Sequence, residues 1–408
     1  NERKKEKKFK ELTWGRDSFP PFFFFFFFSC LSLSLCVCVC VHEREGNGLC
    51  PFINGCCLFI HLFFMLDQVR MKHRLIVLQH GSHGTYRDLG CLARFLRALD
   101  PPPIVLEPQV NEGFRTDDGV LVCGARLAKE VAHALSGLCP GESLGPATHM
   151  TPLVDGRKTV QLSFVSHSMG GLIVREALPQ LVQEVRRHEG SLRVEWKVFC
   201  SIATPHGGAH HMDSFIRSFF GRLIGRVYST AYHDMFLQSN VLTERLISAE
   251  HLASLGLFEH RLLISSIHDI IVPLMSSGFM LRPSQCRGMS PVAREKREMA
   301  MCASSEEEMD LKRHRIETLT AENWPHDEYP VERRIAEAML KGAGAFDSIV
   351  VDFSRVLKQR NDPHVRFTAE QLSHLALVCK EPICQMGLEE VFSFVLRWVA
   401  SELAARHC

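Results

Sequence analysis

The sequence lacks an excess of charge of either sign, since 47 Lys and Arg residues against 46 Asp and Glu residues leave a formal net charge of +1. Proteins that bind nucleic acid present surplus positive charge, so this balance gives no reason to expect a nucleic-acid partner. Hydrophobic residues make up 46% of the chain and charged residues 23%, as in ordinary soluble globular proteins. A length of 408 residues suffices for one large α/β domain or two medium ones.

Regularly spaced cysteines are also missing, although the chain contains 16 cysteines. Seven of them precede Met71 in biased sequence, and the nine that follow are scattered without a Cys-x-x-Cys pair. Zinc sites and the disulfide frameworks of small secreted domains require such spacing. We therefore expect a reducing compartment, the cytoplasm, with neither a zinc site nor a disulfide framework.

Residues 1–70 are of low complexity: a basic run precedes the apolar run "PPFFFFFFFSCLSLSLCVCVCV" and a second apolar stretch. A basic segment before about twenty apolar residues is typical of a signal anchor or a transmembrane helix. The same residues would also result from translation of repetitive DNA, because a thymine run encodes Phe, a CT repeat encodes alternating Leu and Ser, and a TG repeat encodes alternating Cys and Val. We favour this second interpretation, in which residues 1–70 are not native coding sequence and the protein begins at Met65 or Met71. A membrane anchor is expected only if residues 1–66 are genuine.

Beyond Met71 short apolar runs alternate with amphipathic runs, which predicts a single α/β domain over residues 71–408. Strands are expected within 73–81, 102–110, 159–167, 195–206, 260–269 and 346–353. Helices are expected within 89–99, 120–135, 169–185, 331–342 and 387–406. Continuous apolar strands are typical of a parallel sheet buried on both faces. The expected fold is a doubly wound, mostly parallel sheet with helices on both faces.

A serine motif joins one expected strand to the next expected helix. Ser168 has Ser166 two residues before it and Gly170 two residues after it. A nucleophile elbow needs small residues at both positions, because strand and helix come close together at a strained turn. Ser166 is a mild departure from the more usual glycine. An ordinary glycine-rich turn is the alternative, but the strand before and the helix after Ser168 favour a nucleophile.

An acyl-transfer serine also needs two N–H donors for the oxyanion. One is expected from Met169, the residue after the nucleophile, and the other from the loop after an earlier strand. The stretch "QHGSHG" ends the first convincing strand, and Ser82 within it is the candidate second donor. A plain strand-ending turn would explain these glycines equally well on their own. The serine motif downstream favours the oxyanion hole.

The catalytic acid and base should follow the serine in that order. Asp269 ends the strand expected in 260–269, on the same sheet edge as Ser168, although a turn or helix-capping carboxylate is the alternative. The base is expected between the last strand and the last helix. His326 precedes that strand, whereas His364 and His374 both follow it. We prefer His374 because its segment leads directly into the closing helix.

The stretches "HGSHGTYRDL", "TDDGVLVCGARLAKEV", "FVSHSMGGLIVREAL", "IATPHGG" and "HDIIVP" together resemble the lipase-like family of serine esterases in the α/β-hydrolase superfamily. The resemblance spans about Leu75 to Leu396, and the second and fourth stretches are more specific than the serine motif. It implies an α/β-hydrolase fold and hydrolysis of carboxylic esters, lipid esters among them. In that family a tail similar to "SHLALVCKEP" carries the histidine, which supports His374. Ser166 and a long charged insertion depart from the family pattern.

Two segments stand apart from the alternation of strands and helices. The range 209–258 is a candidate helical cap or lid, because apolar residues from Phe215 to Val227 fall at helical spacing. Such a face suits acyl chains, or peripheral contact with a membrane or lipid surface. A helix packed on the core would show the same pattern. The charged insertion, within 276–330, is expected to form a solvated loop.

These parts predict a serine hydrolase that cleaves carboxylic esters through Ser168, Asp269 and His374. Met169 and Ser82 stabilise the oxyanion, and no metal or organic cofactor is required. An acyltransferase or a thioesterase would use the same machinery. A non-catalytic binding module would share the fold. Fold alone does not choose among these alternatives.

Overall fold

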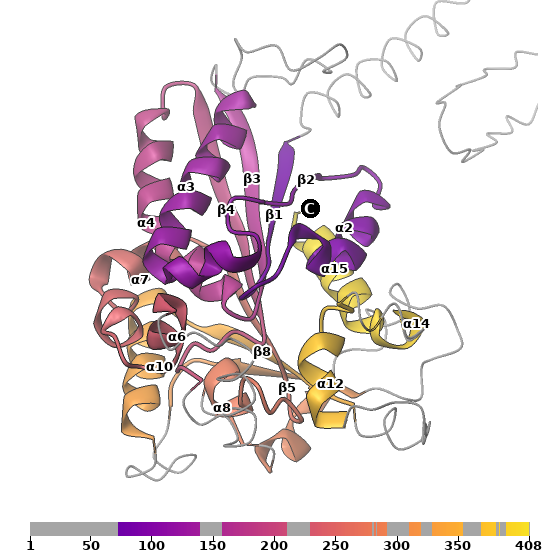
Figure 1. Cartoon of the computed structure of the whole chain (residues 1–408). Helices are drawn as coiled ribbons and strands as arrows, with labels where there is room; N and C mark the ends of the chain where they lie inside the picture. Colours follow the sequence, from indigo (N-terminus) through magenta and orange to yellow (C-terminus); the bar gives the residue numbers. More distant parts are fainter. Residues whose placement is uncertain are drawn as a thin grey trace, which may run out of the picture. The chain divides into compact units, whose positions relative to one another are not determined.

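One mixed sheet lies at the centre of the part of the chain that the structure describes (Figure 1). The structure is a computed structural model and describes residues 72–138, 157–209, 229–279, 281–282, 284–291, 310–319, 329–353, 369–380, 383 and 389–407. Its eight described strands lie in the order β2 (Ile104–Leu106), β1 (His73–Gln79), β3 (Lys158–His167), β4 (Leu192–Ile202), β5 (His260–Ser266), β8 (Phe346–Asp352), β7 (Asp310–Ile316) and β6 (Ser290–Pro291). The strands from β2 to β8 run parallel, and β7 and β6 are antiparallel to their neighbours.

Both faces of the parallel strands are buried, as their continuous apolar sequence requires. Leu75 and Val77 of β1 belong to one hydrophobic cluster, and Ile76 and Leu78 belong to a second cluster on the opposite face. The first cluster contains residues of α3 (Val120–Gly137), α4 (Gly170–Arg187), α7 (Ala249–Gly256) and α10 (Pro330–Ala343). The second contains residues of α2 (Gly90–Arg97), α12 (Ala369–Ala376) and α15 (Phe394–His407).

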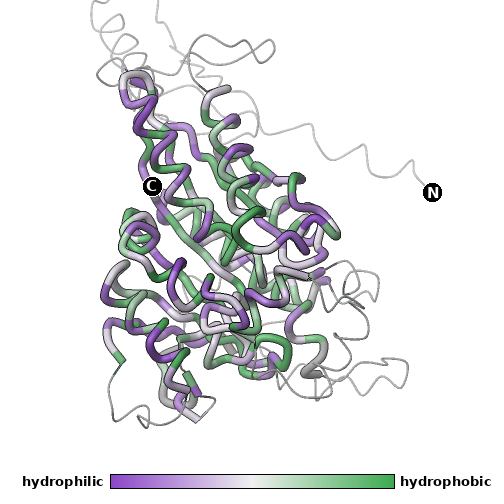
Figure 2. The backbone as a smooth tube through the Cα atoms, turned by 60° about the vertical axis from the view of Figure 1, so that its left-hand side comes forward, coloured by the Kyte–Doolittle hydropathy of each residue, from purple (hydrophilic) through white to green (hydrophobic). Residues whose placement is uncertain are grey.

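The two groups of helices lie on opposite sides of the strands in Figure 1. Figure 2 shows hydrophobic residues along the central strands, while hydrophobic and hydrophilic residues alternate along the outer helices. Shorter elements complete the described chain: α6 (Thr230–Met235), α8 (Leu274–Ser277), α14 (Glu389–Phe392), η1 (Tyr86–Leu89), η2 (Gly113–Asp118), η3 (Val241–Arg245) and η4 (Gln285–Gly288). The doubly wound, mostly parallel sheet predicted from the sequence is therefore confirmed.

Part of the charged insertion is a strand, so the expectation of a solvated loop is wrong for β7. This strand pairs with β8 in antiparallel register, and Leu311 opposite Val351 is fully buried. The charge that suggested a loop is neutralised by partners distant in sequence. Arg313 donates to Asp347 at 2.5 Å and also lies 3.7 Å from Glu402. Strand pairing satisfies the backbone while these ion pairs accommodate the basic side chains.

The expected cap is described only in part. Residues 210–228, which include the amphipathic stretch, lie outside the described residues, as does the expected N-terminal segment 1–70. Within the remainder, α7 contributes Leu252 and Leu255 to the cluster shared with α4 and α10. Residues 249–256 therefore form a helix packed in the core. None of the helices in the described ranges is long and apolar enough to span a membrane.

Candidate functional site

Ser168 occupies a strained turn between β3 and α4. Its φ of 53° lies in the left-handed region, which non-glycine residues adopt only when their surroundings enforce it. The Ser168 N–H donates to the carbonyl of Ile202 on the neighbouring strand, at 2.8 Å. A Cβ at Gly170 would lie 2.5 Å from the carbonyl oxygens of Gln79 and His80, so only glycine fits beneath the loop that follows β1. The turn is therefore a strained junction between strand and helix.

Ser166, the departure from the usual glycine, has a structural partner. Its side chain is fully buried, and its Oγ donates to the carbonyl of Cys200 on β4 at 3.1 Å. A serine here gains a hydrogen bond to the neighbouring strand.

Asp269 and His374 form a buried pair at the carboxyl edge of the sheet. His374 Nδ1 lies 2.7 Å from Asp269 Oδ2, with the histidine side chain 6% exposed and the aspartate side chain 0% exposed. The other carboxylate oxygen, Oδ1, accepts from the N–H groups of Ile271 and Val272, each at 2.9 Å. An ionised carboxylate can only accept, so in the neutral imidazole Nδ1 carries the proton and Nε2 keeps a lone pair. This is the tautomer that a general base requires.

His374 lies beside the serine turn through its contacts with His167, the residue before Ser168. The two imidazole rings are 4.7 Å apart between centroids, and His167 Nε2 donates to the backbone carbonyl of His374 at 3.2 Å. Burial holds the pKa of His167 well below its ordinary value, and the nearby His374 and Lys380 lower it further. A neutral His167 places no positive charge against His374. Between the described residues, no hydrogen bond joins Ser168 Oγ to His374 in the structure.

The histidine expected on a loop lies on helix α12, between β8 and α15, which is the interval that the sequence predicted. The two alternatives for the base, His326 and His364, lie outside the described residues.

The loop from Gly81 to Gly84 closes over Ser168. A Cβ at Gly81 would lie 2.8 Å from Ser168 Cβ and 3.4 Å from Ser168 Oγ, so the backbone comes against the serine side chain. The Gly84 N–H donates to the carbonyl of Gly81 at 3.1 Å, which makes Ser82 and His83 the central residues of a turn. His83 has a φ of 51°. The partly exposed Ser82 is therefore next to the residue that contacts the proposed nucleophile.

Met169 is fully buried and caps the N-terminus of α4. The N–H groups of the first helical turn have no intrahelical acceptor and carry the positive end of the helix dipole. Such donors are suited to a negatively charged oxygen close to Ser168.

A set of buried, hydrogen-bonded side chains on and after α4 was not assigned from the sequence. Arg175 of α4 donates to His206 Nδ1 at 3.2 Å and to the carbonyl of Leu246 at 2.9 Å, and His206 Nε2 lies 2.9 Å from Ser201 Oγ. Burial lowers the pKa of Arg175 to about 9 and holds that of His206 well below its ordinary value. Arg175 and His206 lie in the stretches "FVSHSMGGLIVREAL" and "IATPHGG", but only the fold shows that they contact each other.

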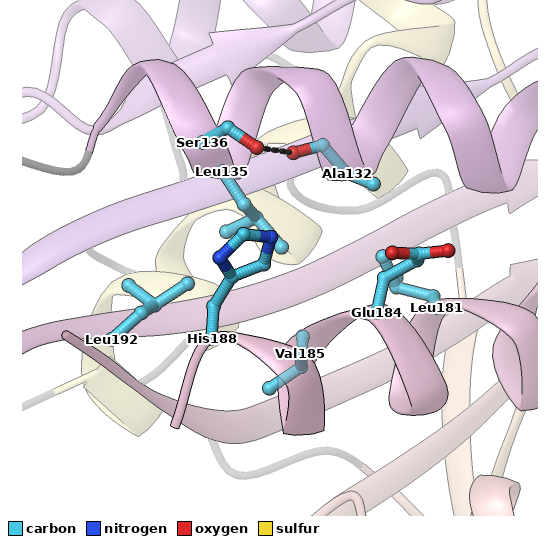
Figure 3. Close-up of a pocket in the computed structure, with 8 residues that line it drawn as sticks. All are labelled: Ala132, Leu135, Ser136, Leu181, Glu184, Val185, His188 and Leu192. Carbon is cyan, nitrogen blue, oxygen red and sulfur yellow. Dashed lines mark hydrogen bonds between the residues drawn. The ribbon is translucent and has the colours of Figure 1, made fainter. Parts of the chain in front are cut away.

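No group of three or more His, Cys, Asp or Glu side chains is arranged to hold a metal ion within the ranges that the structure describes. A small, largely apolar hollow lies between α3 and α4, and Leu135, Leu181 and Leu192 contribute to its lining (Figure 3). Leu192 begins β4, whereas Ser168 follows the end of the parallel strand β3. The hollow is therefore at the opposite edge of the sheet from Ser168.

Comparison with solved structures finds proteins of limited likeness. Phospholipase PlaB from Legionella pneumophila, in complex with thio-NAD, is 15% identical over 47% of this chain and 38% of its own, with a TM-score of 0.32. Lipase B of Aspergillus fumigatus is 15% identical over 81% of this chain and 63% of its own, with a TM-score of 0.31. An extracellular alpha/beta-hydrolase from a Paenibacillus species is 14% identical over 52% of this chain and 84% of its own, with a TM-score of 0.28.

This chain thus spans about two fifths of the length of the Legionella phospholipase, 38%. Nothing about activity or substrate follows from likenesses with such TM-scores. The comparison with curated proteins gave no match.

A family model gives the assignment. The model described as "Putative serine esterase (DUF676)" matches residues 70–285, which is more than half of the 408 residues. The matched range contains Ser82, Ser168 and Asp269 and ends before His374. The chain belongs to the family Putative serine esterase (DUF676), and its fold is a doubly wound, mostly parallel sheet with helices on both faces.

Proposed function

We propose that this protein is a serine hydrolase that cleaves carboxylic esters, with Ser168 as nucleophile, His374 as base and Asp269 as the carboxylate that orients the base. The observation that carries the proposal is the buried pair of His374 and Asp269, 2.7 Å apart, beside the left-handed Ser168. A buried carboxylate that orients a histidine beside a strained serine is the arrangement that an activated nucleophile requires.

In the proposed reaction, His374 Nε2 takes the proton of Ser168 Oγ as the oxygen attacks the ester carbonyl carbon. The tetrahedral oxyanion accepts hydrogen bonds from the N–H groups of Met169 and Ser82. His374 then gives its proton to the leaving alkoxide as the ester C–O bond breaks. Water attacks the acyl-enzyme, with His374 again as base, and releases the acid and the free serine. Asp269 stabilises the imidazolium throughout and keeps its own charge.

We extend the proposal to esters with apolar acyl groups, lipid esters included. Three large apolar side chains are exposed on η2 and the first turn of α3: Phe114 at 70%, Leu121 at 46% and Val122 at 39%. The Phe114 ring packs edge-on against His83, with ring centroids 5.2 Å apart, and His83 directly follows Ser82. Phe114 therefore adjoins the proposed oxyanion hole, where it can contact an acyl chain or a lipid surface.

The test is labelling of the full chain with a fluorophosphonate probe, with p-nitrophenyl esters of increasing acyl length as competitors. We expect Ser168→Ala to abolish labelling, His374→Ala to reduce it by several orders of magnitude, and His326→Ala to leave it unchanged. Longer esters should compete better than the acetate. Loss of labelling in His326→Ala would move the base to that residue. A folded parent protein that does not label would refute the hydrolase and favour a non-catalytic binding module.

A further inference from the structure

The sequence stretch "TDDG", residues 116–119, is specific to the family resemblance, yet the proposed reaction gives it no task. Its first three residues end η2, and Gly119 caps the N-terminus of α3. This segment lies against the turn from Gly81 to Gly84, which contains the candidate donor Ser82.

Backbone contacts hold the turn from the side of η2. The His83 N–H donates to Thr116 Oγ1 at 2.9 Å, and the Thr116 hydroxyl donates to the carbonyl of Gly113 at 2.8 Å. The Gly113 N–H in turn donates to the carbonyl of Gly84 at 2.9 Å. Thr116 is fully buried. A non-glycine residue at a φ of 51° is strained, so His83 keeps this conformation only while such contacts enforce it.

Asp117 supplies the contact to the His83 side chain. Its Oδ1 accepts from His83 Nε2 at 2.8 Å and from Ser229 Oγ, at the N-terminus of α6, at 2.9 Å. The side chains of Asp117 and His83 are 14% and 29% exposed, so the pair is largely shielded from water. The Phe114 ring also packs edge-on against the His83 ring. One carboxylate therefore joins the turn to η2 and to α6.

We propose that Asp117 is a positioning residue, which acts through His83 to fix the N–H of Ser82 where the oxyanion forms. This deepens the proposed hydrolase and rests on it. Ser82 lies between Gly81, which packs against Ser168, and His83, which Asp117 holds. Once His83 is released, the contacts that enforce its left-handed φ are lost, and the turn from Gly81 to Gly84 can relax as a whole. The N–H of Ser82 is then no longer held in one place.

The experiment compares Asp117→Ala with its matched control Asp118→Ala in the full chain. Asp118 is the neighbouring carboxylate, but it is 47% exposed and pairs with Arg126 at the surface, at 2.5 Å. The measurements are kcat and KM for a p-nitrophenyl ester and the inhibition constant of a trifluoromethyl ketone with the same acyl group. The ketone forms an anionic tetrahedral adduct with a serine, so its affinity reports the oxyanion hole, whereas KM reports ground-state binding.

We expect Asp117→Ala to lower kcat and ketone affinity together, by about 10- to 100-fold, with KM within about twofold of the parent. Asp118→Ala should leave all three values within about twofold. Asp117→Asn, which keeps an acceptor oxygen, should restore part of the loss. Thr116→Val, which removes the acceptor of the His83 N–H, should reproduce the loss.

A folded Asp117→Ala with unchanged kcat and ketone affinity overturns the positioning role while the hydrolase stands. If Asp117→Ala does not fold, the same measurements are made on Thr116→Val and Asp117→Asn. Unchanged kcat and ketone affinity in both folded variants then overturn the positioning role. A parent protein that neither turns over the ester nor labels at Ser168 refutes the proposed hydrolase itself.

Discussion

Two carboxylates at the ends of adjacent strands each pair with a histidine, and the two pairs differ in their exposure to solvent. Asp269, after β5, is fully buried and divides its oxygens between two backbone N–H groups and His374. Asp352, at the end of β8, is 30% exposed and pairs with His268 at 3.0 Å. Solvent screens the second pair, whereas the first fixes one tautomer in a dry setting. Only the first pair is expected to matter for turnover.

Asp269→Asn is expected to lower kcat on the order of 10⁴-fold. An Asn Oδ1 can still accept from the backbone N–H groups, so its NH₂ group would face His374 and place the imidazole proton on Nε2. A protonated Nε2 cannot take the serine proton. Steady-state kinetics of both variants test this, with Asp352→Asn expected to stay within about threefold of the parent. Equal losses in the two variants would contradict the assignment of the acid.

At the scale of elements, the junctions of β1, β3 and α4 determine where the reactive groups can lie. The helix begins directly beneath the loop after β1, and this approach is possible because position 170 carries no side chain. Gly90, at the start of α2, has no heavy atom within 4 Å of where its Cβ would be. A close backbone contact therefore requires glycine at position 170, whereas no neighbouring atom requires glycine at position 90.

Gly170→Ala is expected to destabilise the fold by about 1–3 kcal/mol, because the new methyl would lie 2.5 Å from two backbone carbonyl oxygens. Gly90→Ala is the matched control and should stabilise by up to about 1 kcal/mol, since alanine favours the helix. Urea unfolding followed by circular dichroism gives both values. A neutral Gly170→Ala would mean that the loop after β1 moves freely, which would also weaken the proposed oxyanion hole.

The sequence predicted the parallel strands and the flanking helices because each carries its own apolar pattern. It missed β7, because what makes that segment a strand is pairing with β8 and contact of Arg313 with Asp347 and Glu402, none of which is local. The residues alone left three histidines open as the base. Only the fold shows the contact of His374 with Asp269, 105 positions away. The catalytic roles themselves stay predictions.

For the whole molecule, buried neutral histidines on separate elements couple folding to pH. His167 ends β3, His206 follows β4, and His407 ends α15. Burial lowers the pKa of His407 to about 4, and its ring lies 2.9 Å from Ser163 Oγ and 3.3 Å from Gln161 Oε1. The amide oxygen only accepts, so Nδ1 donates to it and Nε2 accepts from the serine hydroxyl. Protonation of Nε2 would break this arrangement.

We expect the free energy of unfolding to fall as the pH drops from 6.5 toward 4. In this window the unfolded His407, with the ordinary pKa of 6.5, binds a proton that the folded state excludes until about pH 4. The free energy of unfolding is thus highest above pH 6.5. Below that pH it falls by about 1.4 kcal/mol per pH unit for each proton that only the unfolded state binds. Urea unfolding at several pH values measures the slope, and His407→Gln should reduce it. An unchanged slope in that variant would contradict the role of His407.

The contact between α2 and the segment after α12 has a consequence for the order of assembly. Lys380, six residues after His374, forms an ion pair with Asp88 of η1 at 2.8 Å, and Glu389 pairs with Arg94 of α2. A folding intermediate with β1 to β5 formed but this contact still open would contain Ser168 and Asp269 without the histidine. On the proposed mechanism its serine would be unreactive. The yield of fluorophosphonate adduct would then count fully folded molecules, and kinetics of reactivation after dilution from urea would report the docking of the C-terminal segment.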